Sequence, residues 1–393
     1  MDVRGERRWI TLTGLLLLAG AAAGGDTLSP IVIQGKFDTA TEHVLIPVTI
    51  GAHPFWCNPD SGFSALIALD LTKATAAGLT VSPGIPTPDG NPPPPGDRNT
   101  TTTLDVGGVT FTNQAVILRR LPEEAPDMDC IIGVALLRRF VVEFDYVTPQ
   151  VRLIERSAYQ PAAGMETLPL LFRTNPNVPY VDIQLTASEG TSLPLRVVPD
   201  TGTSFYGAVL VGSAMARARS LLPSARAVVY ADGRITQILA ARPRALSVGA
   251  SSVSAPVIAL LEGSLGANGS IADGTLGSGF FRKFTVAFDF DGRKLYLTPN
   301  NRTSQRQAFD ASGIGFIRRG NRHIVYDVIP DSVGAGAGVR TGDALVTIDD
   351  RAAGDLTTLE VRSLLSSDGV TRRLTVERGG QTLTFVLPLK ARI

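Results

Sequence analysis

The sequence predicts a mainly β protein with two repeated lobes and a smaller α+β domain at its C-terminal end. Of the 393 residues, 40 are Gly and 26 are Pro, and hydrophobic residues make up 44%. This composition provides apolar cores and many turns between short strands. Because domains typically hold roughly 100–200 residues, the length indicates two to four units. An internal repeat, and a change of residue pattern near residue 300, divide the chain into such units.

The first residues have the pattern of an export leader. Arg4, Arg7 and Arg8 precede an apolar run, and small residues follow it. An uncleaved membrane anchor is the alternative, but the stretch 9–23 is shorter than the roughly 20 residues that cross a bilayer. We therefore expect a signal peptide over residues 1–25. The mature protein would be periplasmic or secreted, with no membrane span after cleavage.

The charge and the metal-ligating residues exclude several classes of partner. The chain has 37 basic and 36 acidic residues, so its charge favours neither nucleic acid nor an anionic membrane surface. Two cysteines and three histidines leave few ligands for a His/Cys metal cluster. We expect neither a metal nor an organic cofactor.

The two halves of the chain repeat the same features in the same order. Each half has an alternating apolar strand, an Asp-[Ser/Thr]-Gly tripeptide, an apolar-Gly element and a strand that ends in Phe-Asp. The aspartates of the two tripeptides, Asp60 and Asp200, are 140 residues apart. Three later pairs are each 144 residues apart: Gly133 and Gly277, Phe144 and Phe288, and Asp145 and Asp289. Four landmarks in register indicate a duplication, with lobes over 26–165 and 166–300.

The two tripeptides place a carboxylate on a tight turn after an apolar strand. A single Asp-Ser-Gly or Asp-Thr-Gly is most often an ordinary turn. In duplicated lobes, however, a pseudo-twofold axis can bring Asp60 and Asp200 together. Two carboxylates at close range cannot both ionise cheaply, so one pKa rises and the pair can supply an acid and a base. Symmetry leaves open which aspartate takes which role.

These motifs resemble those of the aspartic proteases over roughly residues 27–300. The resemblance is pepsin-like in having two lobes in one chain and retroviral-like in lobe size. It implies two retropepsin-like β-barrel lobes that form a bilobal aspartic protease. It also implies an aspartic-type endopeptidase in which Asp60 and Asp200 share one proton and activate water against a peptide carbonyl. The implied supporting residues are Ser61, Gly62, Thr201, Gly202 and Thr203.

Other positions extend this comparison or depart from it. In the family the apolar-Gly strand lies beside the catalytic turn, which implies a disulfide between Cys57 and Cys130; two free buried thiols are the alternative. Tyr230, in a hairpin expected to turn at 232–233, is assigned to substrate binding by position alone. Phe63 replaces a small residue of the family, and Asn58-Pro59 replaces apolar residues. These departures motivate an alternative function, a catalytically inactive peptide-binding scaffold.

After a polar linker at 301–307, residues 308–390 resemble a PDZ domain. The run 337–343, Ala-Gly-Val-Arg-Thr-Gly-Asp, is the most specific part of the match. A capping box at Thr357–Glu360 predicts a helix, and Gly379-Gly380 predicts a hairpin between the last two strands. The resemblance implies a C-terminal peptide ligand; a bracing domain without ligand is the alternative. The implied peptide-binding residues are Gly313, Ile314, Gly315, Phe316, Val361 and Leu365.

Overall fold

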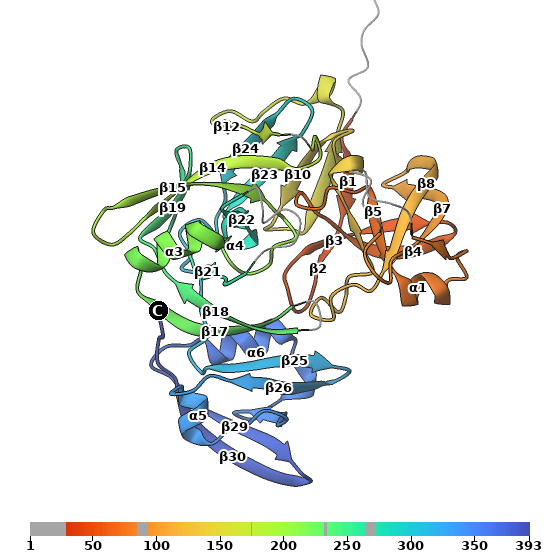
Figure 1. Cartoon of the computed structure of the whole chain (residues 1–393). Helices are drawn as coiled ribbons and strands as arrows, with labels where there is room; N and C mark the ends of the chain where they lie inside the picture. Colours follow the sequence, from red (N-terminus) through yellow and green to blue (C-terminus); the bar gives the residue numbers. More distant parts are fainter. Residues whose placement is uncertain (1–28, 85–92, 174, 232–233, 264–271) are drawn as a thin grey trace, which may run out of the picture.

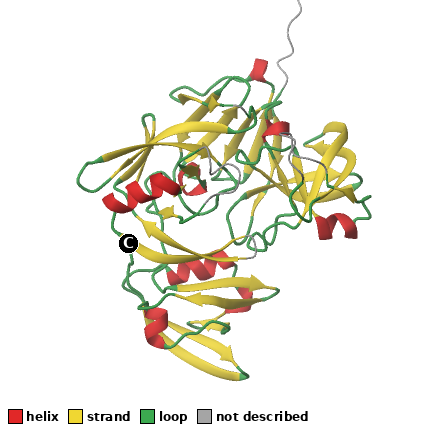
Figure 2. Ribbon diagram, viewed as in Figure 1, coloured by secondary structure: helices red, strands yellow, loops and turns green. Residues whose placement is uncertain are grey.

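The computed structural model describes residues 29–84, 93–173, 175–231, 234–263 and 272–393, and it is mainly β (Figures 1 and 2). The expected signal peptide and the expected turn at 232–233 lie outside the described residues. Strands from the two halves lie side by side, and the C-terminal domain packs beneath the second half in the view of Figure 1. Within the described chain, no helix has the length and apolar character needed to cross a membrane.

Lobe 1 is built from short strands with few helices, as the composition predicts. Its elements are β1 (Ile31–Gln34), β2 (Lys36–Phe37), β3 (Val44–Ile50), β4 (His53–Pro59), β5 (Ile67–Asp70), α1 (Leu71–Ala76), β6 (Ser82–Pro83), β7 (Arg98–Val106), β8 (Val109–Arg119), β9 (Cys130–Ile132), α2 (Val134–Leu137), β10 (Val141–Asp145), β11 (Gln150–Ile154) and η1 (Arg156–Ala158).

Lobe 2 repeats this order, but the long strands β7 and β8 of lobe 1 are each divided in two, as β18 with β19 and β20 with β21. Its elements are β12 (Glu166–Pro169), β13 (Leu171–Phe172), β14 (Pro179–Thr186), β15 (Ser192–Pro199), β16 (Ala208–Leu210), α3 (Gly212–Leu221), β17 (Ser224–Ala231), β18 (Arg234–Ala241), β19 (Ala245–Val248), β20 (Ser251–Ser254), β21 (Ile258–Leu260), β22 (Gly274–Leu276), α4 (Ser278–Phe281), β23 (Phe284–Asp289) and β24 (Lys294–Pro299).

The pairing of strands around each tripeptide is the same in both lobes. In lobe 1, β4 runs parallel to β9, β9 is antiparallel to β5, and β5 is parallel to β8. In lobe 2, β15, β22, β16 and β21 pair in the same senses. In both lobes, the strand before the tripeptide (β4 or β15) is therefore held by the strand of the apolar-Gly element (β9 or β22).

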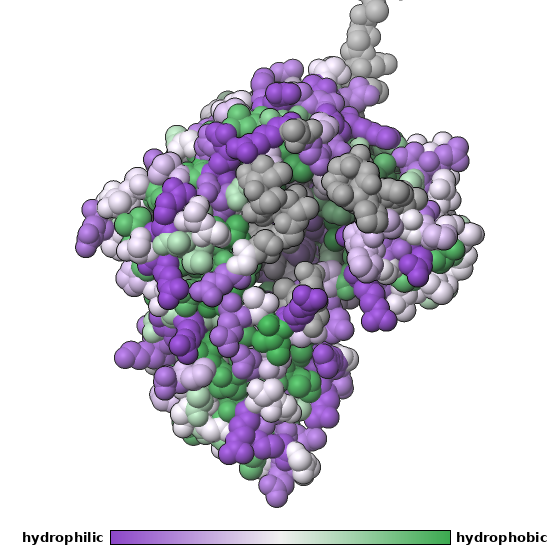
Figure 3. Space-filling view, in the orientation of Figure 1, coloured by the Kyte–Doolittle hydropathy of each residue, from purple (hydrophilic) through white to green (hydrophobic). Residues whose placement is uncertain are grey.

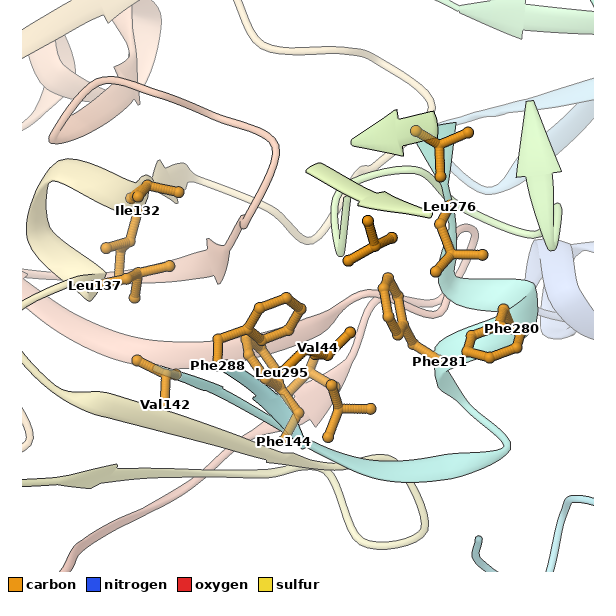
Figure 4. Packing of buried hydrophobic residues seen from close by; sticks show 14 of the residues in the cluster. Val44, Ile132, Leu137, Val142, Phe144, Leu276, Phe280, Phe281, Phe288 and Leu295 are labelled. Carbon is orange, nitrogen blue, oxygen red and sulfur yellow. The ribbon is translucent and has the colours of Figure 1, made fainter. Parts of the chain in front are cut away.

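A sheet shared by the lobes carries the pseudo-twofold symmetry. Its strand order, β1-β11-β10-β23-β24-β12, places equivalent strands at equal distances from its centre. At the centre, β10 pairs antiparallel with β23, and Glu143 lies opposite Ala287. One buried cluster crosses this boundary, with the ring of Phe288 5.9–6.0 Å from those of Phe144 and Phe281 (Figure 4). These contacts join the lobes into one core.

The C-terminal domain has its own core and a five-strand path, β25-β26-β27-β29-β30. The predicted capping box is present at the start of its long helix, and the predicted hairpin turns at Gly379-Gly380. Figure 3 shows hydrophilic residues over most of one face of the molecule, with hydrophobic residues also exposed over this domain. Its elements are β25 (Ile314–Arg319), β26 (Arg322–Val328), α5 (Val333–Ala337), β27 (Ala344–Ile348), β28 (Arg351–Ala352), η3 (Ala353–Asp355), α6 (Thr358–Leu365), β29 (Thr371–Arg378) and β30 (Gln381–Pro388).

Candidate active site

The two aspartates occupy equivalent turns immediately after β4 and β15. Each backbone N–H donates across the parallel pair at 2.8 Å, from Asp60 to the Ile132 carbonyl and from Asp200 to the Leu276 carbonyl. The inner carboxylate oxygen of each aspartate then accepts two N–H groups of its own turn. These donors are Gly62 (2.7 Å) and Phe63 (3.2 Å) for Asp60, and Gly202 (2.8 Å) and Thr203 (3.1 Å) for Asp200.

Each carboxyl group lies against the turn of the opposite lobe. A Cβ on Gly62 would lie 2.4 Å from Cγ of Asp200, and one on Gly202 would lie 2.3 Å from Oδ2 of Asp60. Such contacts exclude any side chain, so glycine is required at both positions. The carboxyl groups of Asp60 and Asp200 are close enough to interact with each other. The structure therefore brings the two predicted catalytic residues together.

Ser61 and Thr201 brace the two turns across the pseudo-twofold axis. The Ser61 hydroxyl donates to the Pro199 carbonyl (2.8 Å) and accepts the Thr201 N–H (3.0 Å). Reciprocally, the Thr201 hydroxyl donates to the Pro59 carbonyl (2.8 Å) and accepts the Ser61 N–H (3.0 Å). Both side chains are buried. Because buried backbone groups need partners, these bonds fix the distance between the aspartates.

The surroundings of the two carboxyl groups differ in one respect. The Thr203 hydroxyl donates to the outer oxygen, Oδ2, of Asp200 at 2.8 Å, and it lies 3.0 Å from the Thr275 hydroxyl. The equivalent residues in lobe 1 are Phe63 and Ile131, which carry no hydroxyl. Only Asp200 receives this side-chain donor. Thr275 was not predicted, since its role depends on a residue far away in the chain.

The pKa of Asp60 is raised well above its usual value. Burial is the largest cause and the charge of Asp200 is the next, while the N–H donors of its own turn oppose both. A hydrogen bond to the charged form of a carboxyl group favours that form. Asp200 has the extra donor, so the asymmetry favours an ionised Asp200 beside a protonated Asp60. The sequence alone left these roles unassigned.

Cys57 and Cys130 are joined by a disulfide between β4 and β9. Both cysteines are fully buried. The bond ties the strand that leads to Asp60 to the strand whose Ile132 carbonyl holds its N–H. This is the pairing that the family resemblance implied.

Tyr230 lies at the end of β17 and contacts the C-terminal domain. Its ring centre is 5.7 Å from that of Tyr326, and its hydroxyl donates to Oε2 of Glu123 at 3.3 Å. Among the described residues we find no contact between Tyr230 and either aspartate. The hairpin itself forms as predicted, but the C-terminal domain draws this side chain to a domain boundary.

The loop predicted to hold a peptide carboxylate already contains a carboxylate of the chain. Oxygens of Asp310 accept the N–H groups of Ser312 (2.9 Å) and Gly313 (2.8 Å), and Arg392 pairs with Asp310 at 3.0 Å. The Ile314 N–H donates to the Ser312 hydroxyl at 3.1 Å. Three amides at the start of this loop are therefore occupied.

The other predicted peptide-binding residues lie at the groove between β25 and α6, but mostly beneath its surface. Ile314 and Phe316 are 5–6% exposed, and Val361 and Leu365 are at most 1% exposed, all within the domain core. Any Cβ on Gly315 would meet the Tyr326 ring at 2.7 Å. In this conformation the groove offers little apolar surface to a ligand.

The groove also faces lobe 1. A cavity at this boundary is lined by three residues of β25 and two of α6, which oppose two loops of lobe 1. Its lining includes Phe316, Arg318, Thr358, Arg362, Ala40 and Glu123. Nη1 of Arg362 donates to the Ala40 carbonyl at 2.9 Å, and the Leu359 N–H to the Thr39 carbonyl at 3.3 Å. The domain is thus docked on the body through the face expected to bind peptides.

Comparisons with known proteins agree with the C-terminal assignment. Residues 312–389 match the family model described as PDZ domain. No curated protein matches the chain. Among solved structures, the chain is similar to an aspartic proteinase from Irpex lacteus, with 13% identity and a TM-score of 0.47, over 71% of this chain and 100% of that chain.

The duplicated lobes, the shared sheet and the paired Asp-[Ser/Thr]-Gly turns form an aspartic-protease-like fold with both lobes in one chain. The chain also carries a PDZ domain at residues 312–389, and this domain contacts both lobes. This confirms the predicted fold class.

Proposed function

We propose that the chain is an aspartic-type endopeptidase that hydrolyses peptide bonds in exported peptides or proteins. The observation that carries this proposal is the pairing of Asp60 and Asp200 on braced, equivalent turns, with unequal support for their charged forms. A pair of carboxyl groups with separated pKa values can act as an acid and a base at one pH.

In the proposed reaction, the Asp200 carboxylate accepts a proton from a water molecule as the water oxygen bonds to the peptide carbonyl carbon. Protonated Asp60 donates to the carbonyl oxygen and stabilises the charge that develops there. Asp200 then passes its proton to the amide nitrogen, the C–N bond breaks, and the products are a carboxyl group and an amine. No further group is required for the balance of this step.

The PDZ domain supports a role in binding peptide chains, which can strengthen engagement of a substrate by raising its local concentration. The proposed ligand is an extended peptide that adds to the outer edge of β25, where no strand pairs among the described residues. The contact with lobe 1 described above means that such a ligand must displace part of the docked surface.

A catalytically inactive peptide-binding scaffold is the second candidate, and Phe63 with Ile131 is the observation that favours it. These two apolar residues leave Asp60 without the side-chain donor that Asp200 has. Hydrolysis of a broad peptide library from about pH 3 to 8 separates the candidates, since the acid–base pair needs one proton shared between its carboxyl groups. Activity that disappears in both Asp60→Asn and Asp200→Asn supports the peptidase; a parent protein without activity throughout supports the scaffold.

A further inference from the structure

The catalytic turn of lobe 2 is longer than that of lobe 1. In each lobe, the glycine of the apolar-Gly element and the residue after it donate their backbone N–H groups to carbonyls of this turn. The acceptors are Phe63 and Leu66 in lobe 1, and Thr203 and Gly207 in lobe 2, at 2.8–3.0 Å. Residues 64–65 separate the acceptors in lobe 1 and residues 204–206 in lobe 2. Lobe 2 must therefore accommodate one extra residue directly after its catalytic tripeptide.

The extra residue is accommodated by strained backbone at Phe205. Its φ is +65°, a region that residues other than glycine rarely adopt. The Tyr206 N–H donates to the Ser204 carbonyl at 2.7 Å, which closes a three-residue turn around Phe205. Such turns with a positive φ at the centre are rare and strained. Strained backbone persists only where its surroundings hold it, so the groups that hold Phe205 also determine the shape of the catalytic turn.

Two side chains hold the backbone of Phe205. Its N–H donates to the Ser278 hydroxyl at 3.0 Å, and its carbonyl accepts Nε2 of Gln307. The other end of the same amide, Oε1 of Gln307, accepts the Val257 N–H at 3.0 Å. Gln307 is only 7% exposed, so both ends of its amide need a partner. Its side chain therefore joins the catalytic turn to the residue that precedes β21.

Gln307 belongs to the segment 301–307, whose polar sequence predicted a linker between domains. The structure fixes this segment to lobe 2. Nζ of Lys283, a 4% exposed residue that follows α4, donates to the carbonyls of Arg302 (2.8 Å) and Gln305 (2.6 Å). The segment is thus held at its start by a buried ammonium group and at its end by the Gln307 amide.

Apolar contacts extend this attachment beyond the segment. Phe309, two residues after Gln307, is 9% exposed and lies in a buried cluster that also contains Val257. Phe205 of the catalytic turn and Ile393 at the C-terminal end pack against this cluster. The turn is therefore supported by residues that lie outside both duplicated lobes.

We propose that Gln307 is a positioning residue for Asp200, the base of the proposed reaction. Gln307 holds the strained backbone of Phe205, which lies two residues beyond Thr203. The Thr203 hydroxyl donates to Asp200 at 2.8 Å, and the Thr203 carbonyl accepts the N–H of Ser278, whose hydroxyl holds Phe205. Movement of Phe205 would therefore displace the hydroxyl donor of Asp200. For its catalytic consequence, the proposal rests on the proposed peptidase function.

Amide hydrogen exchange of the full chain, followed by mass spectrometry, tests the positioning without any need for activity. Gln307→Met keeps the approximate volume of the side chain but removes both hydrogen bonds. Exchange in the segment 203–207 should become about tenfold faster than in the parent, as expected for one lost hydrogen bond. Gln305→Met is the matched control, because the Gln305 side chain is exposed, and it should leave this exchange unchanged. Unchanged exchange of 203–207 in Gln307→Met overturns the proposal.

Peptide hydrolysis as a function of pH tests the catalytic consequence. Gln307→Met should lower kcat at the optimum by about tenfold with little change in KM, because it disturbs the base and not the binding of substrate. The acid limb of kcat should move to higher pH, since the hydroxyl that favours ionised Asp200 is displaced. A reduced kcat with an unmoved acid limb would mean only that less of the protein is folded, and it would contradict the positioning role.

Gln307→Glu separates the two hydrogen bonds of the amide. The Glu side chain has nearly the same shape and can still accept the Val257 N–H, but it can donate to the Phe205 carbonyl only when it is protonated. Its kcat relative to the parent at the same pH should therefore approach one as the pH falls, and should match that of Gln307→Met once the carboxyl group ionises. A ratio that does not change with pH contradicts the role of the donor.

If the parent protein has no peptidase activity, the exchange experiment alone decides. Faster exchange of 203–207 in Gln307→Met, but not in Gln305→Met, would then retain Gln307 as the residue that positions this turn. Only the proposed function would be lost.

Discussion

Thr203 donates its hydroxyl to the outer oxygen of Asp200 at 2.8 Å, and the equivalent residue in lobe 1, Phe63, cannot make this bond to Asp60. A hydrogen bond to a charged group is worth about 1.5–3 kcal/mol. This hydroxyl donor distinguishes two aspartates whose surroundings the duplication would otherwise make alike. Removing this donor from lobe 2 should move the acid limb of the pH profile to higher pH, and adding one to lobe 1 should move the alkaline limb to lower pH.

Replacing Thr203 with Val should weaken the charged form of Asp200. The acid limb of kcat should then move to higher pH, and kcat at the optimum should fall by about 10- to 100-fold. Peptide hydrolysis as a function of pH measures both effects. Val has nearly the same volume as Thr, so the turn itself should persist. An unchanged acid limb with reduced kcat would mean that Thr203 acts only on the structure of the turn.

Replacing Phe63 with Thr is the matched experiment in lobe 1. A hydroxyl at this position can donate to the outer oxygen of Asp60, which favours its ionised form and lowers its pKa. The alkaline limb should therefore move to lower pH, while the acid limb stays in place. The same hydrolysis assay measures this. Movement of the acid limb instead would reverse the assignment of acid and base.

Asp60→Asn should stabilise the protein, and more so as the pH rises. The pKa of Asp60 is raised in the folded state, so above the unfolded value of about 3.9 the native state holds a proton that the unfolded state has lost. Stability therefore falls with rising pH until the folded pKa is passed, and Asn removes this dependence. We expect little difference from the parent at pH 3 and a higher unfolding midpoint for the variant at pH 6–7.

Denaturant unfolding at each pH, followed by the fluorescence of Trp56 on β4, measures this effect in lobe 1. In protein made without residues 1–25, Trp56 is the only tryptophan. Asp355→Asn, an exposed carboxylate of the C-terminal domain, is the control and should show no such trend. An Asp60→Asn variant that is less stable than the parent at pH 7 would contradict the raised pKa.

The sequence predicted the parts of the fold that depend on local pattern and on the repeat. The alternating apolar strand predicted before the first tripeptide is β3, and the hairpin predicted at Gly379-Gly380 joins β29 to β30. The catalytic turns were found because each tripeptide follows an apolar strand at matched spacing. Period-two alternation and glycine turns are local signals, and duplication doubles them.

The missed features all depend on contacts between distant segments. Thr275 supports Thr203 only because β22 runs beside β15. Tyr230 was expected over the substrate, yet Tyr326 of the PDZ domain packs on it. Docking between domains depends on surface complementarity, for which a single sequence carries no periodic signal.

Loss of the disulfide should destabilise lobe 1 and its catalytic turn. The bond between Cys57 and Cys130 closes a separation of 73 residues. A disulfide typically contributes about 2–4 kcal/mol of stability, and long loops lie at the upper end of that range. A Cys57→Ala, Cys130→Ala double variant should therefore unfold at lower denaturant concentration by Trp56 fluorescence, and it should lose activity at lower temperature than the parent. Equal midpoints for the double variant and the oxidised parent would show that packing alone holds β4 to β9.

Release of the PDZ domain from lobe 1 should strengthen its binding of peptides. Arg362 of α6 donates to the Ala40 carbonyl, and Glu123 of lobe 1 accepts from Tyr230 and pairs with Arg319 at 3.7 Å. A ligand that needs an undocked domain binds with an affinity reduced by the undocked fraction. Arg362→Ala and Glu123→Ala, which weaken the contact from opposite sides, should each raise affinity by about 3- to 10-fold.

Calorimetric titration with peptides that end in a free carboxylate measures this change, with amidated peptides for comparison. Arg351→Ala is the control, because Arg351 pairs with Glu360 on the exposed side of α6. Since Glu123 belongs to lobe 1 and not to the PDZ domain, a gain in both variants can arise only through the domain contact. Equal affinities in the parent and both variants would mean that the docked face is not where peptides bind, and the domain would then serve to brace the lobes.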